Sequence, residues 1–279
     1  MGKIRVLVVD DSVLARSLLR AYLENDSAIE VVGEAENGRK AVQLVNELRP
    51  DLVTMDLAMP VMSGIEAIAE IMATQAVPIL VVSAVADAQN AYAAVASGSL
   101  DVLSKQGADA DEGAAFVAKV KLLSSVRVIS HIRSRLSSQA TVEPVSLSPD
   151  VVAAPPPEVN QQRVFAIASS TGGPQALALI LGKLPAAFPC PILISQHIAD
   201  GFAPGMVKWL TGISKLPVRL AQDGEKIMPA TVYLSPSETN LVVSPSRCLR
   251  LDKASPGEMY HPRCDELLGS VAEVYGRQS

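Results

Sequence analysis

Three carboxylates, a hydroxyl and an ammonium group follow apolar segments in the first half of the sequence: Asp10, Asp11, Asp56, Ser83 and Lys105. In an open parallel sheet, the residues that follow the strands meet at the carboxyl edge. Clustered carboxylates repel one another, so a hard cation such as Mg²⁺ is expected to neutralise them. The pattern predicts that Asp56 attacks a phosphoryl group and that Ser83 and Lys105 contact the phosphoryl oxygens.

A serine and a histidine follow two apolar segments in the second half. Ser170 lies in the turn Ala168-Ser169-Ser170-Thr171-Gly172-Gly173-Pro174, and His197 follows residues 192–195. A serine on a strand–turn–helix junction is a good nucleophile when a base lies nearby, and backbone N–H groups at the helix start stabilise an oxyanion. Taken alone, such a turn more often serves phosphate binding or packing than catalysis, and a lone histidine is more often structural.

Alternating strands and helices would position both sets of residues. The expected strands are 4–9, 31–35, 52–57, 79–84 and 101–104, followed by 164–168, 192–195, 218–221, 232–234 and 241–243. The expected helices are 12–25, 38–49, 64–74, 86–97, 112–135, 174–183 and 264–275. Continuous apolar strands separated by helices predict parallel sheets covered on both faces. Between the two halves, residues 134–162 are rich in Ser, Pro, Val and Ala and are typical of a linker.

Composition narrows the class of protein. The 279 residues carry a net charge of −5, which disfavours nucleic acid as a partner. The three cysteines lack metal-binding spacing, which indicates a reducing compartment. The N-terminus does not resemble a signal peptide and no stretch is long enough to cross a bilayer, so we expect a cytoplasmic protein without membrane insertion.

The first half resembles the receiver domain of two-component response regulators. The matching segments are Val8 to Ser12, Asp51 to Pro60, Ser83-Ala84 and Lys105. The resemblance implies a flavodoxin-like α/β fold over residues 3–122, phosphorylation of Asp56 by a chemotaxis histidine kinase, and Mg²⁺ bound by Asp11, Asp56 and the backbone carbonyl of Ala58, with Asp10 in support. Two positions depart from the family pattern, Gln106 after the lysine and Val102 three residues before it. The alternative is that Asp10 and Asp11 merely cap a helix.

The whole chain resembles the chemotaxis-type protein-glutamate methylesterase family, in which a receiver is linked to a catalytic α/β domain. The matching segments are residues 168–174, 196–202, 223–225, 232–236 and 264–268. The resemblance implies hydrolysis of glutamate methyl esters on the cytoplasmic domains of chemoreceptors, and deamidation of receptor glutamines. It also implies that Ser170 is the nucleophile, His197 the base and Thr171 a neighbour of the oxyanion. We place a linker with the end of the preceding helix at 123–162, and the catalytic domain at 163–279.

The family pattern includes a Gly-Met-Gly-x-Asp-Gly turn that carries a catalytic aspartate, and these 279 residues do not contain it. We therefore expect an incomplete doubly wound parallel domain, in which the Ser–His pair can be slowed by roughly 10⁴-fold. Two hypotheses follow. Either the chain is a methylesterase whose unphosphorylated receiver covers the Ser170/His197 edge, or it is a catalytically inert regulator that acts only as a phosphorylation-dependent binding module.

Overall fold

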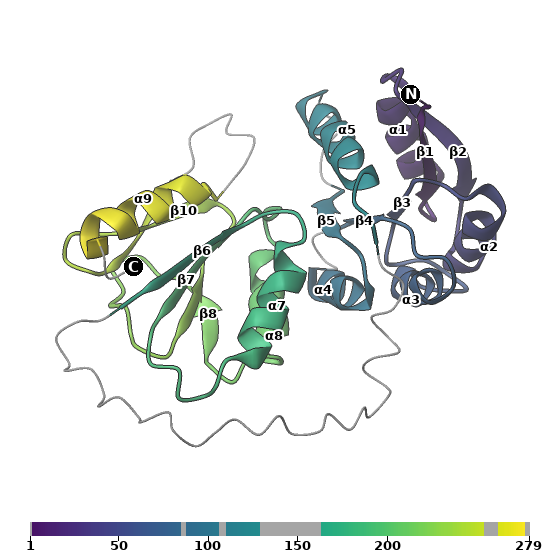
Figure 1. Ribbon diagram of the computed structural model, residues 1–279. Coiled ribbons are helices and arrows are strands. Elements are labelled where there is room, and N and C mark those ends of the chain that lie inside the picture. The colour runs from purple at the N-terminus through teal and green to yellow at the C-terminus, as the bar shows by residue number, and fades with distance from the viewer. Residues whose placement is uncertain (1, 85–87, 106–109, 129–162, 254–261, 277–279) are drawn as a thin grey trace, which may run out of the picture.

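The computed structural model describes residues 2–84, 88–105, 110–128, 163–253 and 262–276. Within these ranges the chain forms two α/β halves, each built around a parallel sheet (Figure 1). No helix in the described part of the chain is long and apolar enough to span a membrane.

The N-terminal sheet has the strand order β2-β1-β3-β4-β5, and every neighbouring pair is parallel. Its strands are β1 (Ile4–Val9), β2 (Ile29–Ala35), β3 (Leu52–Met55), β4 (Ile79–Ser83) and β5 (Asp101–Ser104). The helices between and after them are α1 (Val13–Glu24), α2 (Gly38–Leu48), α3 (Gly64–Thr74), α4 (Ala88–Ser97) and α5 (Ala110–Ser124). The predicted flavodoxin-like fold is confirmed, because the central strands are buried on both faces, as continuous apolar runs require.

One predicted helix is too long. The sequence pattern predicts a helix over 112–135, but α5 ends at Ser124. Val126 and Val128 then pack against the apolar cluster under α1 and α5 from a non-helical segment. The apolar residues of the predicted helix therefore do pack on the core, but the last of them do so after the helix has ended. The remainder of the predicted helix and the linker from residue 129 to 162 lie outside the described residues.

The C-terminal sheet has the order β6-β7-β9-β8 and is also parallel. Its strands are β6 (Phe165–Ser169), β7 (Ile192–Gln196), β8 (Val218–Leu220) and β9 (Val232–Leu234). The helices of this half are α7 (Gly173–Lys183), α8 (Ala203–Thr211) and α9 (Cys264–Tyr275). The sequence analysis predicted α7 and α9 but missed α8.

A separate antiparallel hairpin accompanies this sheet, formed by β10 (Thr239–Val243) and β11 (Leu249–Lys253). The sequence analysis missed β11. In this strand Leu249 and Leu251 alternate with Arg250 and Asp252, a pattern typical of an antiparallel strand with one face in solvent. The expected all-parallel arrangement therefore holds for the four-stranded sheet and not for the hairpin.

The two halves pack directly against each other. Figure 1 shows α4 of the N-terminal half beside α7 and α8. The ring of Tyr92 on α4 stacks on Trp209 of α8, with centroids 5.6 Å apart and planes inclined by 22°. Gln175 of α7 donates from Nε2 to the carbonyl oxygens of Val95 and Ser99, at 3.3 and 2.8 Å. One apolar cluster of buried side chains runs through both halves, so this contact is part of the core.

Candidate active sites

The carboxyl edge of the N-terminal sheet gathers the predicted acidic residues. Asp10, Asp11 and Asp56 each offer an oxygen within 4.8 Å of the others, with Asp10 and Asp56 buried and Asp11 exposed. The ammonium group of Lys105 lies 2.7 Å from Asp10 Oδ2 and 2.9 Å from Asp56 Oδ2. Hard carboxylate oxygens of this kind suit Mg²⁺. Ala58, the predicted carbonyl ligand, lies two residues after Asp56 in an exposed bend.

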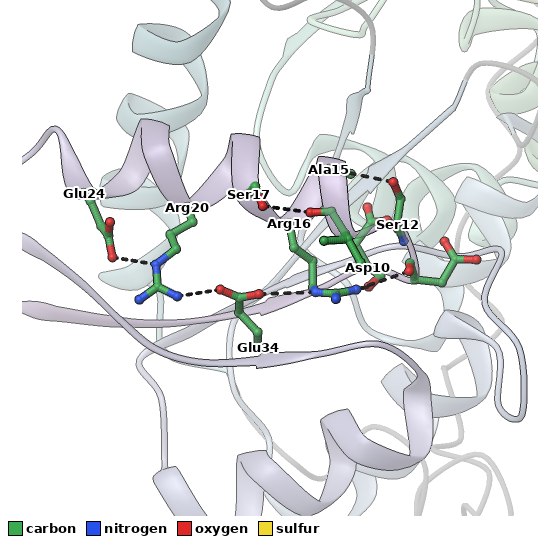
Figure 2. Close-up of polar contacts among 10 residues, drawn as sticks. Asp10, Ser12, Ala15, Arg16, Ser17, Arg20, Glu24 and Glu34 are labelled. Carbon is green, nitrogen blue, oxygen red and sulfur yellow. Dashed lines mark hydrogen bonds and ion pairs between the residues drawn. The ribbon is translucent and has the colours of Figure 1, made fainter.

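Backbone contacts at the start of α1 hold Asp10 in place (Figure 2). Ser12 is the N-cap, and its hydroxyl accepts a hydrogen bond from the N–H of Ala15 at 3.4 Å. Asp10 Oδ1 accepts from the N–H of Ser12 at 2.9 Å, and Arg16 donates to the carbonyl of Asp10 at 2.7 Å while also pairing with Glu34. The cap is therefore Ser12, which leaves the other carboxylate oxygen of Asp10 directed at Lys105.

Two further features shape this edge. The hydroxyl of Ser83, at the end of β4, is buried and has no hydrogen-bond partner among the described residues. Gly64, the first residue of α3, approaches the backbone of Asp56 so closely that a Cβ there would lie 1.9 Å from the Asp56 carbonyl oxygen. The sequence analysis did not identify Gly64, because only the fold brings α3 against the loop that follows β3.

Burial and pairing act in opposite directions on the charges. Burial raises the pKa of the Asp56 carboxyl, and the neighbouring Lys105 only partly offsets that increase. Burial by itself lowers the pKa of the Lys105 ammonium, but its hydrogen bonds and ion pairs with Asp10 and Asp56 outweigh it, so the pKa lies above its ordinary value. The edge therefore holds two buried acids on one partly buried cation.

The carboxyl edge of the C-terminal sheet brings Ser170 and His197 together. Ser169 and Gln196 face each other in register as the last residues of β6 and β7, so the residue after each strand reaches the same rim. The Oγ of Ser170 lies 3.1 Å from Nδ1 of His197, which is hydrogen-bonding distance. Gly172 caps α7 with a φ of 74°, a left-handed conformation that favours glycine, and this lets the turn present Ser170 at the rim.

A buried carboxamide lies beneath this pair. Gln196 accepts a hydrogen bond from the hydroxyl of Ser169 and donates to the carbonyl oxygens of Ser170 and His197. The sequence analysis treated Gln196 only as part of a family motif. Its position at the end of a strand, next to the histidine and facing a serine-rich turn, was the signal that could have identified it.

The N-terminal half contacts the nucleophile turn itself. Thr171, the expected neighbour of the oxyanion, donates from its hydroxyl to Asp101 Oδ2 of β5 at 3.2 Å. Lys119 of α5 lies 2.7 Å from the same carboxylate oxygen and 3.3 Å from the Thr171 hydroxyl. A cavity of about 220 Å³ lies at this contact and is lined by these three residues together with Ser170 and His197. In this arrangement the Ser–His rim faces the receiver half, with Ser170 and His197 both partly exposed.

The fold and the two edges define a response regulator whose receiver half is joined to a second α/β half, and that second half carries the serine–histidine pair of a hydrolase. Comparison with known families agrees: residues 6–115 match the response regulator receiver domain and residues 165–279 match the CheB methylesterase family. A protein-glutamate methylesterase/protein-glutamine glutaminase 3 of Paramagnetospirillum magneticum is 50% identical over 279 residues, which cover all of this chain and 78% of that protein. The protein of the same description in Myxococcus xanthus is 40% identical over 284 residues, covering 99% of this chain and 75% of its own length.

The chain therefore belongs to the family of receiver-linked protein-glutamate methylesterase/protein-glutamine glutaminases, which are hydrolases. This confirms the family predicted from the sequence motifs. It does not favour the hypothesis of a purely non-enzymatic regulator.

Proposed function

We propose that this chain hydrolyses methyl esters of glutamate side chains, and deamidates glutamines, on the cytoplasmic domains of chemoreceptors under the control of Asp56 phosphorylation. The observation that carries the proposal is the 3.1 Å contact between Ser170 Oγ and His197 Nδ1 at a strand edge. The substrate class comes from the relatives that match this chain over nearly its full length, because their names state these two reactions. Such a substrate places the protein in the cytoplasm.

The chemistry follows from the contact. Ser170 Oγ attacks the ester carbonyl carbon while its proton passes to His197, and the resulting oxyanion is stabilised by backbone N–H groups of the turn between Ser170 and α7. Collapse of the tetrahedral intermediate breaks the bond to the methoxy group, which takes the proton from His197 and leaves as methanol. Water, deprotonated by His197, then attacks the acyl-serine and releases the glutamate. With a glutamine substrate the same steps release ammonia.

The acidic edge supplies the control. A carboxylate oxygen of Asp56 attacks the phosphorus of a phosphohistidine on a chemotaxis histidine kinase, and the imidazole leaves. The buried hydroxyl of Ser83, which has no partner among the described residues, and the ammonium group of Lys105, 2.9 Å from Asp56, would contact the new phosphoryl oxygens. The donor set fits Mg²⁺, which Asp11, Asp56 and the carbonyl of Ala58 would hold, and the ion would neutralise charge that develops on those oxygens.

The contact between the halves supports occlusion of the esterase site in the unphosphorylated state. β5 ends one residue before Lys105 and begins with Asp101, which binds the hydroxyl of Thr171 beside the nucleophile. When Lys105 turns from Asp10 and Asp56 to a phosphoryl group, strain reaches β5 and weakens the Asp101–Thr171 contact. The receiver then separates from the Ser–His rim, and a receptor helix gains access.

The test is methanol release from methylated receptor membranes, with and without a small-molecule phosphodonor and Mg²⁺. We expect release that the phosphodonor increases and that Ser170→Ala abolishes. Equal rates with and without the phosphodonor would overturn the control mechanism. A rate equal to that of Ser170→Ala would overturn the hydrolase and leave only the binding module.

A further inference from the structure

The side-chain amide of Gln196 joins the two strands that precede Ser170 and His197, and every polar group of this amide is hydrogen-bonded. Gln196 is the last residue of β7 and is only 1% exposed. Its Oε1 accepts from the hydroxyl of Ser169 at 2.6 Å, and its Nε2 donates to the carbonyl oxygens of Ser170 and His197, both at 2.8 Å. The two N–H groups and the oxygen of the amide are thus all paired, and two of the three bonds go to the backbone of the reacting residues.

The surroundings of this side chain require an amide. Two carbonyl oxygens can only accept hydrogen bonds, so the group between them must present two donors, and the hydroxyl of Ser169 calls for an acceptor on the other side. Glutamine combines these functions in one plane, whereas an ionised glutamate would be acceptor-only and would place negative charge against both carbonyls. An asparagine side chain is shorter by one methylene group.

The start of α7 is built around the same amide. A Cβ on Gly173 would lie 2.0 Å from Oε1 of Gln196 and 2.8 Å from the Cβ of Ser169, so the helix begins with glycine in order to admit the carboxamide. The carbonyl oxygen of Ser170 accepts both from Gln196 and from the N–H of Gly173, each at 2.8 Å. The N–H of His197 donates to the carbonyl of Ser169 at 2.9 Å and continues the ladder between the strands.

We infer that Gln196 is a positioning residue, which sets the distance between the Ser170 hydroxyl and the His197 ring by holding the backbone of both. This inference rests on the proposed esterase function and adds to it a residue that touches neither the substrate nor the reacting atoms. Misplacement of reacting groups by about 1 Å can cost on the order of 10²-fold in rate. The bonds to Ser170 and His197 are therefore expected to affect turnover much more than substrate binding.

The experiment compares Gln196→Glu and Gln196→Met with the unmodified chain. The substitutions keep the approximate length of the side chain and replace the amide donors, in one case with a carboxylate and in the other with an apolar group. We expect kcat for methanol release to fall by about 10²-fold with KM within about threefold, because lost alignment raises the barrier to the chemical step and leaves substrate binding largely intact. The rate at which a fluorophosphonate labels Ser170 should fall in parallel, because that reaction needs the Ser–His pair but no receptor.

Two further variants separate positioning from general stability. Thr231→Val removes another buried hydroxyl–carbonyl bond, from Thr231 to the carbonyl of Pro229, at the opposite end of the sheet. It should lower Tm as much as the Gln196 variants do while leaving the labelling rate unchanged. Ser169→Ala removes only the bond to Oε1, so it should fold even if Gln196→Met does not, and should slow labelling by only about threefold.

A measurement without turnover keeps the inference independent of the proposed function. The chain has three histidines, so the ring nitrogens of His197 can be assigned by NMR. Ser170→Ala should shift the His197 nitrogen signals when Gln196 is present. It should have little effect on them in the Gln196→Glu background, where Ser170 and His197 are no longer aligned. An equal effect in both backgrounds, or labelling of the Gln196 variants within twofold of the unmodified rate, would overturn the positioning role. Absence of methanol release and labelling in the unmodified chain would instead overturn the proposed function.

Discussion

The two carboxyl edges of this molecule share the same parallel-sheet geometry but are held together by different interactions. At the N-terminal edge, Asp10 and Asp56 are buried against the single ammonium group of Lys105, so the edge is dominated by charge. At the C-terminal edge, Ser170 and His197 rest on Gln196, and the supporting bonds are made by an amide, a hydroxyl and backbone carbonyls. A phosphoryl acceptor must tolerate developing charge, whereas a serine nucleophile depends on alignment.

The contrast teaches how one half can control the other. The charged edge can be altered by a change of charge, because ion pairs from Lys105 to Asp10 and Asp56 hold the end of β5 in place. At the neutral edge, hydrogen bonds from the buried Gln196 hold the backbone of Ser170 and His197, so we expect this edge to keep its geometry. We propose that control falls on access to the rim, because the Asp101–Thr171 bond beside the rim and the Tyr92–Trp209 stack both join the halves.

The largest expected effect separates the two edges completely. Ser170→Ala should lower methanol release to background, since it removes the attacking oxygen, and should leave phosphate incorporation from a phosphodonor unchanged. Asp56→Asn should do the reverse, abolishing incorporation and keeping the basal hydrolysis. Ser246→Ala, in the exposed turn between β10 and β11, is the matched control and should change neither. Loss of both activities in one variant would show that the edges are not independent.

The next effect concerns the contact between the halves. Trp209→Leu removes the ring that stacks on Tyr92 and should raise basal methanol release by about tenfold, because a weaker interface exposes the Ser–His rim more often. The stimulation by phosphodonor should shrink by the same factor. Leu179 of α7 is 66% exposed, so the control variant Leu179→Ala should leave the rates of methanol release unchanged. Unchanged basal release in Trp209→Leu would argue against occlusion.

A third prediction tests whether charge dominates the N-terminal edge. Lys105→Met leaves Asp10 and Asp56 buried without their cation and should lower the free energy of unfolding by about 1–3 kcal/mol, since breaking a buried ion pair leaves an uncompensated charge. Millimolar Mg²⁺ should restore much of the loss. Lys215→Met, at an exposed position in the C-terminal half, should show neither effect. Denaturant titrations with and without Mg²⁺ make the comparison, and an equal deficit under both conditions would contradict it.

The smallest effect concerns a partly exposed carboxylate at the other end of the receiver half. The Lys121 side chain, together with the N–H of Ala28, holds the pKa of Asp26 below its usual range. A depressed pKa contributes stability above the unfolded-state value of about 3.9, and this contribution is lost as the pH falls through the folded-state pKa. The difference in Tm between the unmodified chain and Asp26→Asn should therefore be small at pH 7 and should vanish on acidification. A difference that grows below pH 4 would refute this sign.

Much of the fold could be predicted from the sequence, because each apolar segment carries its own period and its own end signals. The predicted helix over 264–275 coincides with α9, and the strand over 232–234 coincides with β9. The errors arose where local signals are ambiguous. The apolar residues after Leu123 continue the helical spacing although the helix has ended, and α8 begins without a side-chain cap.

By itself, the sequence determined that Asp56, Ser170 and His197 lie near the carboxyl ends of strands, although β3, β6 and β7 each end one or two residues from the predicted position. Residue type and position along the chain are enough for that placement. Only the tertiary structure decided which groups meet across elements: Gly64 against Asp56, Gln196 under two carbonyls, and Asp101 against Thr171. Gly64 and Asp56 are 8 positions apart in the sequence, Gln196 and Ser170 are 26 apart, and Asp101 and Thr171 are 70 apart. Distances of that kind depend on strand order and helix packing, which no local pattern encodes.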